Sequence, residues 1–160
     1  VDNTEEAKDA IRFAKYPPIG ERGIAPWFAA PMGLHASEVI KNANNETVLL
    51  LQMESVEAYE RLDETLELED FEVLLVGPED LAASLGFPGN KYHEKVETIM
   101  RDVAEKMQKR GKSLATTFAG PDDARRWIAE GYRMMNVGSV LTIGTVRMKE
   151  IYAELREEFG

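Results

Sequence analysis

The sequence contains no cysteine, only two histidines and no long apolar run. The lack of cysteine excludes disulfides, zinc bound by thiolates and a thiol nucleophile. No stretch approaches the ~20 apolar residues of a transmembrane helix, so we expect no membrane partner. A reducing cytoplasm fits the lack of cysteine, and we expect a cytoplasmic protein.

Basic residues are also scarce. The chain has 19 Lys and Arg against 29 Asp and Glu, which gives a formal net charge of -10. A general nucleic-acid binder needs clustered Lys and Arg, so we expect no nucleic-acid partner. An anionic substrate would need a metal ion or one or two arginines to supply positive charge locally. The length of 160 residues, with 44% hydrophobic and 30% charged residues, fits one ordinary globular domain over residues 1–160.

Four short apolar runs, each bounded by turn or charged residues, are typical of β-strands. They are Val48–Met53, Glu72–Gly77, Ser113–Phe118 and Arg133–Gly138. The first two are almost continuously apolar, which is the pattern of parallel strands buried on both faces.

Segments with helical spacing of apolar residues lie between these runs. They are Thr4–Lys15, Val56–Leu66, Pro78–Leu85, Tyr92–Arg110, Pro121–Glu130 and a last helix from about Val146 to Phe159. The alternating order predicts an α/β fold with parallel strands and helical crossovers. Four strands can form an open sheet or part of a closed barrel, and a full eight-stranded barrel needs ~250 residues. We expect Tyr16–Ala36 to be irregular, and loops of that length are often functional.

In α/β barrels the chemistry lies at the carboxyl ends of the strands. The four predicted strand ends carry Gln52–Ser55, Gly77–Asp80, Thr116–Phe118 and Asn136–Ser139. Glu54 and Asp80 follow consecutive strands and together could hold a hard divalent cation. Purely structural roles are also open, because Asp80 would favour a helix start through the helix dipole and Glu54 could assist a helix cap.

The Gly77-Pro78 pair opens a helix directly after the second strand. Backbone N–H groups at a helix start bind anions, so the amides of Glu79 and Asp80 could receive a substrate carboxylate. A simple strand-to-helix turn explains the same residues equally well.

One segment, Tyr16–Gly23 (YPPIGERG), resembles the YPPxGxRG motif of the HpcH/HpaI aldolases, such as hydroxy-oxo-heptanedioate and 2-dehydro-3-deoxyglucarate aldolases. Other segments resemble the family's motifs in the same order: Leu51–Ser55, Val76–Ala82, Gly86–His93 and Gly111-Lys112. The resemblance implies a (β/α)8 TIM barrel of which this chain covers roughly the second half. It places Val1 at the exit of the fourth strand, so we expect the upstream strands to be absent from this chain.

The resemblance also implies roles for individual residues. Glu54 and Asp80 would bind Mg²⁺, Mn²⁺ or Co²⁺, and Gln52 would lie near the 2-oxo acid. Gly77, Pro78 and Glu79 would form the turn whose amides receive the substrate carboxylate. The implied activity is that of a class II aldolase, a carbon–carbon lyase. Such an enzyme cleaves 2-oxo-3-deoxy or 4-hydroxy-2-oxo acids to pyruvate and an aldehyde, with the metal as Lewis acid. The implied assembly is a homo-oligomer, a hexamer in which the last helix packs on a neighbour.

The acid–base half of the site is expected from the missing upstream strands, so we assign no catalytic residue in this chain. His93 fits a helix cap, and His35 lies in the long loop. Arg22 is a candidate for an anion contact, a subunit contact or a structural ion pair. Trp27 and Phe28 could line an aldehyde pocket or a subunit contact, or serve packing alone.

Two segments depart from the family pattern, and two alternatives stay open. Leu114–Thr117 replaces the usual Gly-Ile-Leu, and Val140 follows Ser139 where the family has Asp, which leaves the substrate range open. A CoA-ester lyase of the citrate-lyase β type uses a similar strand-end Glu and Asp, but it lacks the tyrosine–proline motif. The other alternative is a non-catalytic half-barrel that only oligomerises.

Overall fold

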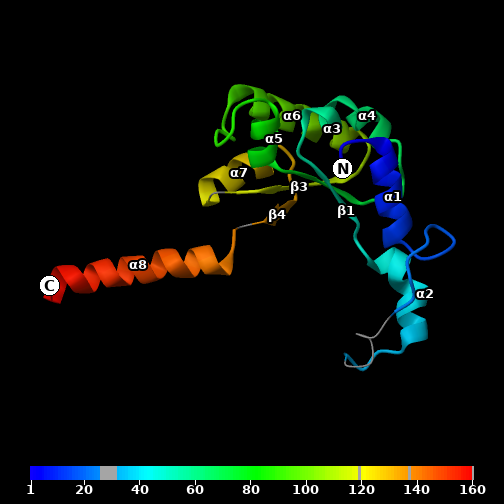
Figure 1. The fold of residues 1–160 in the computed structure, drawn as a ribbon, viewed down its shortest axis with the longest axis horizontal. Helices are drawn as coiled ribbons and strands as arrows, with labels where there is room; N and C mark the ends of the chain where they lie inside the picture. The colour runs from blue at the N-terminus through cyan, green and yellow to red at the C-terminus, as the bar shows by residue number, and fades with distance from the viewer. Residues whose placement is uncertain (26–31, 119, 137, 160) are drawn as a thin grey trace.

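Four parallel strands form one sheet in the computed structural model, which describes residues 1–25, 32–118, 120–136 and 138–159. The strands are β1 (Leu50–Met53), β2 (Val73–Val76), β3 (Ser113–Thr117) and β4 (Met134–Asn136), and they pair in that order (Figure 1). Each strand lies inside the range predicted from the sequence, although Val137 of the fourth range is outside the described residues. The predicted α/β class with parallel strands is therefore confirmed.

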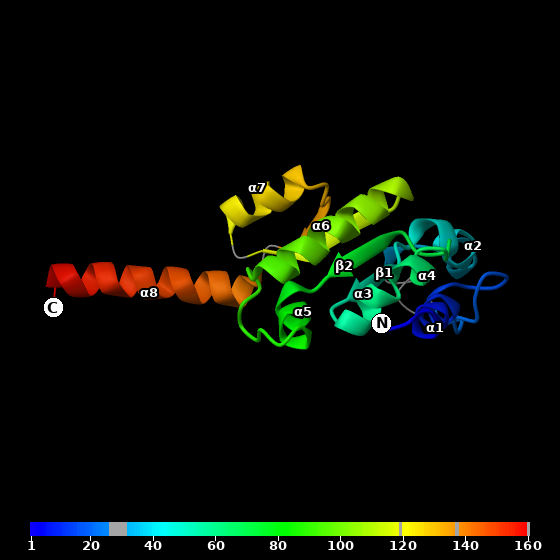
Figure 2. The same cartoon turned by 90° about the horizontal axis from the view of Figure 1, so that it is seen from above.

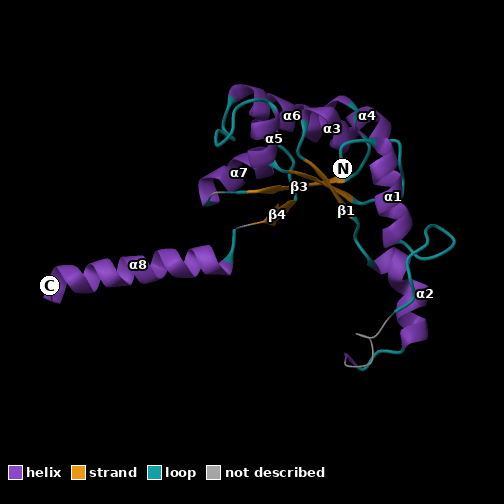
Figure 3. Cartoon of the chain, in the orientation of Figure 1, coloured by secondary structure: helices purple, strands orange, loops and turns teal. Residues whose placement is uncertain are grey.

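The helices between the strands cover one side of the sheet (Figures 1 and 3). They are α3 (Val56–Glu60), α4 (Leu62–Thr65), α5 (Pro78–Ser84), α6 (Glu94–Lys109) and α7 (Pro121–Ala129). Alternate strand residues such as Leu51, Leu74 and Leu114 are buried in one apolar cluster with the α6 stripe. On the other side of the sheet, Gln52 and Met134 of the outer strands are exposed, whereas the small Ala115 between them is buried. The sheet thus has a covered side and an open side.

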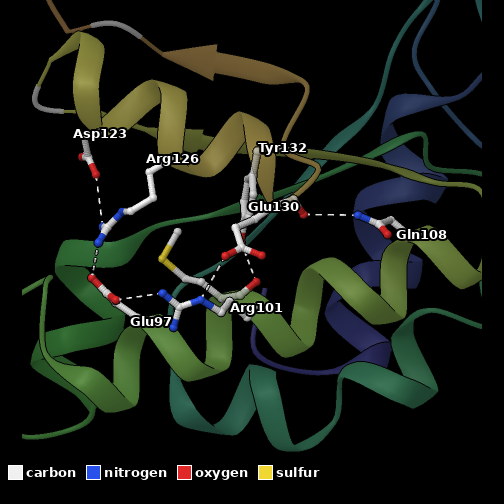
Figure 4. Close-up of polar contacts among 8 residues, drawn as sticks. Glu97, Arg101, Gln108, Asp123, Arg126, Glu130 and Tyr132 are labelled. Carbon is white, nitrogen blue, oxygen red and sulfur yellow. Dashed lines mark hydrogen bonds and ion pairs between the residues drawn. The ribbon is translucent and has the colours of Figure 1, made fainter.

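An ion-pair network also joins α6 to α7 (Figure 4). The Glu97 carboxylate accepts from Arg101 at 3.1 Å and from Arg126 at 2.6 Å. Arg101 also pairs with Glu130 at the end of α7, at 3.1 Å. Beneath this network the Tyr132 hydroxyl donates to the Met100 carbonyl at 3.0 Å, and burial raises the pKa of that phenol well above its ordinary value. The four charged side chains and the phenol of this junction are therefore all paired within the chain.

Helix α1 (Thr4–Ala14) leads into the Tyr16–Gly23 segment, which closes the carboxyl end of that helix. The amides of Glu21 and Arg22 donate to the carbonyls of Arg12 and Lys15 at 2.6 and 3.0 Å. A Cβ at Gly20 would lie 2.3 Å from the Lys15 carbonyl oxygen, so only glycine fits there. The tyrosine–proline segment therefore has a structural role at the helix end.

Helix α2 (Ala36–Glu46) is not predicted from the sequence, which indicates an irregular segment up to Ala36 and no helix between that segment and the strand run that begins at Val48. Its Asn44 side chain accepts from the Tyr16 amide at 2.7 Å and donates to the Tyr16 carbonyl at 2.8 Å. This long-range pairing fixes α2 against the loop that precedes it, and no local pattern indicates it.

Other boundaries also differ from the prediction. The single helix expected over Val56–Leu66 is divided at Arg61 into α3 and α4. Helix α8 (Val140–Phe159) begins earlier than predicted, because the Ser139 hydroxyl accepts from the Thr142 amide at 3.1 Å and caps it. No residue of α8 is buried, and the helix extends away from the sheet (Figures 1 and 2). Within the described ranges, no helix has the length and apolar character needed to cross a membrane.

Candidate active site

Glu54 and Gly77 lie side by side at the carboxyl end of the sheet. The Gly77 amide donates to the Met53 carbonyl at 3.0 Å and so extends the β1–β2 ladder to these residues. A Cβ at Gly77 would lie 2.8 Å from Oε2 and 3.1 Å from Cβ of Glu54. The Gly77 φ of -91° suits any residue, so glycine is needed here for space and not for backbone conformation.

The Glu54 carboxylate is oriented by a neighbour on the same strand. The Gln52 amide nitrogen donates to Glu54 Oε2 at 2.5 Å. Glu54 does not cap α3, as one structural alternative would have it; that role belongs to Ser55, whose hydroxyl accepts from the Ala58 amide at 3.0 Å. Glu54 is therefore free of a capping function.

Asp80 lies in the first turn of α5, directly after the β2 end. Pro78 occupies the first helical position, and Gly77 provides no side-chain cap. The amides of Glu79 and Asp80 make no hydrogen bond to any described residue. The Glu79 carboxylate is ion-paired with Lys91 at 3.1 Å, whereas the exposed Asp80 has no ion pair within the described part of the chain. The helix start thus offers a carboxylate and two open N–H donors.

These residues fit a divalent cation. Glu54 and Asp80 follow adjacent strands, which lie ~4.8 Å apart. Carboxylate oxygens are the ligands that Mg²⁺ and Mn²⁺ prefer. Neither carboxylate is neutralised by Lys or Arg among the described residues. Those residues include no group of three or more potential ligands, so a cation here would take its other ligands from water or substrate.

The other candidates lie elsewhere or have structural partners. Arg22 lies at the opposite end of the sheet, where its guanidinium is 5.1 Å from the centre of the Tyr16 ring. The structural ion pair considered for it is not seen among the described residues. His93 is a helix cap as expected, since its Nδ1 accepts from the Lys95 amide at 3.2 Å. His35 is exposed at the start of α2.

Trp27 and Phe28 lie outside the described residues. Two supporting residues were missed from the sequence. Asp2 accepts from the Ser55 hydroxyl, and Ser84 accepts from the Val56 amide at 3.0 Å, which fixes the chain just after Glu54. Their partners are 53 and 28 residues away, so no local signal could have indicated them.

A family model described as HpcH/HpaI aldolase/citrate lyase matches residues 1–143. The chain belongs to this family. A 2-keto-3-deoxy-L-rhamnonate aldolase of Escherichia coli (strain K12) is 34% identical over 139 residues, which are 86% of this chain and 52% of that protein. The chain therefore spans about half the length of the curated relatives it matches. The predicted family is confirmed, and the family is one of aldolases and lyases.

Solved structures agree with this assignment. An HpcH/HpaI aldolase/citrate lyase family protein from Burkholderia cenocepacia J2315 matches with a TM-score of 0.87 and 27% identity, covering 98% of this chain and 62% of that one. An HpcH/HpaI aldolase from Desulfitobacterium hafniense DCB-2 matches with a TM-score of 0.81 and 27% identity, over 96% of this chain and 60% of that one. The citrate synthase SbnG, at 20% identity and a TM-score of 0.84 over 99% of this chain and 61% of its own, shares the fold. The prediction of part of a TIM barrel is confirmed.

Proposed function

We propose that this chain carries the metal- and carboxylate-binding half of the active site of a class II aldolase. Its substrate would be a 3-deoxy or 4-hydroxy 2-oxo acid that is cleaved to pyruvate and an aldehyde. One observation carries the proposal. Two carboxylates, Glu54 and Asp80, lie at the same end of the sheet, and neither has a cationic partner in the described part of the chain. The amides of Glu79 and Asp80 at that end make no hydrogen bond to a described residue. The identity to a sugar-acid aldolase supports the substrate class.

Different residues would bind the cation and the substrate carboxylate. Glu54 and Asp80 would hold a divalent cation, and Gln52 orients the Glu54 carboxylate through its amide nitrogen. The amides of Glu79 and Asp80 would receive the substrate carboxylate. Such a cation, when bound, supplies Lewis acidity that polarises the 2-oxo carbonyl.

Gly77 contributes by having no side chain. A Cβ there would lie 2.8 Å from Glu54 Oε2, so glycine lets the Glu54 carboxylate keep the position in which it would bind the cation. We assign no acid–base residue among the described residues, and we expect that part of the site from the upstream half of the barrel.

A paramagnetic NMR experiment tests this function. With Mn²⁺ present, the chain should broaden the methyl signal of pyruvate well beyond the effect of free Mn²⁺. Glu54→Gln and Asp80→Asn should remove the additional broadening, whereas Glu79→Gln should retain it, because that carboxylate is paired with Lys91. Equal broadening in all variants would contradict the proposal. Saturable binding of an acetyl-CoA ester without binding of pyruvate would favour the CoA-ester lyase instead.

Helix α8 supports a second proposal, that the chain forms a homo-oligomer. Apolar side chains along it are exposed: Leu141 (80%), Met148 (72%), Tyr152 (66%), Leu155 (51%) and Phe159 (77%). Their spacing places them on one stripe of the helix. Exposed apolar stripes of this kind mark interaction sites.

Light scattering at micromolar concentration distinguishes the outcomes. The wild-type chain should form oligomers, and Met148→Glu with Leu155→Glu should dissociate them while β-sheet content stays the same. Arg147→Glu, an exposed charged neighbour paired with Glu150, is the matched control for an added acidic residue. A wild-type monomer would contradict this proposal.

A further inference from the structure

The strand register aligns one side chain from each strand in a row across the carboxyl end of the open side of the sheet. This row, here called the mouth row, consists of Glu54, Gly77, Thr117 and Asn136. Thr117 pairs with Asn136 directly, and Glu54 and Gly77 come one residue after the last pairs of their strands, Met53 with Val76 and Val76 with Thr116. Successive strand residues alternate between faces. Thr116 is fully buried and donates its hydroxyl to the Val76 carbonyl at 2.9 Å on the covered side, so Thr117 lies on the open side with Glu54.

The mouth row has no side chain of its own at Gly77 and is polar at both ends. A Cβ at Gly77 would lie 2.8 Å from Glu54 Oε2 and 3.5 Å from the Gln52 amide nitrogen, so these two side chains lie over the glycine. On the other side Thr117 of β3 lies about one strand spacing from Gly77, ~4.8 Å, and Asn136 of β4 follows. The two flanks of Gly77 therefore differ in charge, with a carboxylate on one and neutral hydrogen-bonding groups on the other.

The neutral flank has hydrogen-bonding capacity that the described residues leave unused. The Thr117 hydroxyl makes no hydrogen bond to a described residue. The Asn136 carbonyl oxygen accepts from the Gly138 amide at 3.2 Å, which fixes the carboxamide in place. Its NH₂ group is then left with two donors and no described partner. A hydroxyl group could accept from Asn136 and donate to Thr117 at the same time.

We propose that Thr117 and Asn136 form a subsite for a hydroxyl group on the substrate carbon chain. The inference rests on the proposed function, because it takes the 2-oxo acid to be held at Glu54 and the α5 amides. A hydroxyl four bonds from the 2-oxo carbon reaches about one strand spacing, ~4.8 Å, from Gly77 to Thr117. The substrate class is therefore a hydroxylated 2-oxo acid. An alkyl chain in the same place would make no hydrogen bond with Thr117 or Asn136 and would bind more weakly.

Two oxamates of equal size probe this subsite without being cleaved. N-(2-hydroxyethyl)oxamate and N-propyloxamate share a carboxylate next to a carbonyl, and they differ only by a terminal hydroxyl in place of a methyl group. Calorimetric titration in saturating Mn²⁺ gives both dissociation constants. The wild-type chain should bind the hydroxyethyl compound about tenfold more tightly, the effect of one net hydrogen bond.

Two variants should remove that preference. Thr117→Val keeps the side-chain shape and removes the hydroxyl. Asn136→Asp keeps the oxygen that accepts from Gly138 and removes the donors. In each variant the ratio of the two dissociation constants should fall toward one. Using the ratio cancels the charge that Asn136→Asp adds, because both oxamates are anions.

Ser113→Ala is the matched control, since Ser113 is exposed on the same side of β3 at its other end. It should leave the ratio unchanged. If Thr117→Val also leaves the ratio unchanged while both oxamates bind, the subsite is wrong and the proposed function stands. If neither oxamate binds the wild-type chain in Mn²⁺, the proposed function fails, and the subsite fails with it.

Discussion

The two ends of the sheet use their charged groups in opposite ways. At the amino end, Lys15 is only 2% exposed, and its ammonium donates to Glu72 at 2.8 Å and to two backbone carbonyls. Glu72 also accepts from the Leu49 amide. At the carboxyl end, Glu54 has only the neutral Gln52 as a partner, and Asp80 has no ion pair within the described ranges.

Lys112 shows the same use of charge at the amino end. Its ammonium donates to the carbonyls of Phe71 and Glu69 at 2.8 and 3.2 Å, and burial lowers its pKa. A buried charge must be satisfied within the fold, so such groups fix the chain. Carboxylates without a cationic partner, such as Glu54 and Asp80 among the described residues, add little stability and are available to a ligand. The comparison therefore separates a structural end of the sheet from a binding end.

The largest expected effect is at the structural end. Lys15→Met should lower the free energy of unfolding by about 2–3 kcal/mol, because it removes a buried donor from three acceptors, although the half-exposed Glu72 can recover water. Urea unfolding measures this change. Lys8→Met, which removes an exposed pair with Glu5, is the control and should change stability by less than about 0.5 kcal/mol. Equal losses of stability in the two variants would contradict a structural role for the buried Lys15.

The next effect belongs to the binding end. Gly77→Ala should weaken Mn²⁺ binding about tenfold, because the new methyl group displaces the Glu54 carboxylate. Its effect on stability should stay below about 1 kcal/mol, since the backbone conformation accepts alanine. Calorimetry and urea unfolding separate the two quantities. Gly23→Ala, where a Cβ meets nothing within 4 Å, should change neither.

Much of the fold was predictable because it depends on local patterns. The continuous apolar runs around Leu51 and Leu74, and the start and stop residues Pro121 and Gly131, place their elements correctly. Helix α2 was missed because it is held by a side chain, Asn44, whose partner is 28 residues away.

The site, like the fold, was predictable where it depends on strand ends and not where it depends on contacts between distant residues. Glu54 and Gly77 each follow one of two consecutive strands, which predicts that they lie at the same end of the sheet. In the structure they are in contact. The sequence could not indicate that Arg22 lies at the other end of the sheet, because loop direction depends on how Tyr16 and Lys15 are bound.

A smaller effect concerns pH. Burial raises the pKa of Glu72, but hydrogen bonds from Lys15 and the Leu49 amide outweigh it, so the pKa in the folded state is lowered. A lowered pKa stabilises the fold above the unfolded-state pKa, and this contribution is lost as the pH falls through the folded-state pKa. Glu72→Gln should therefore be less stable than wild type at pH 7, and the gap should close below about pH 4. A gap that widens in acid would contradict this account.

The smallest expected effect is that of Asp80→Asn on stability. The aspartate has no ion pair among the described residues and gains only from the start of α5, so the free energy of unfolding should change by less than about 0.5 kcal/mol. If Asp80→Asn instead lowered the free energy of unfolding by several kcal/mol, Asp80 would have a structural role, and the carboxyl end of the sheet would not be a binding end alone.

The most direct test of the binding end is a calorimetric titration of Mn²⁺ into the chain, with and without pyruvate. The wild-type chain should bind Mn²⁺, and pyruvate should tighten that binding. Glu54→Gln and Asp80→Asn should each abolish it, while Lys15→Met, in the fraction that is folded, should retain it. Unchanged Mn²⁺ affinity in both carboxylate variants, or no binding by the folded wild-type chain, would contradict the assignment of these two residues to a metal site.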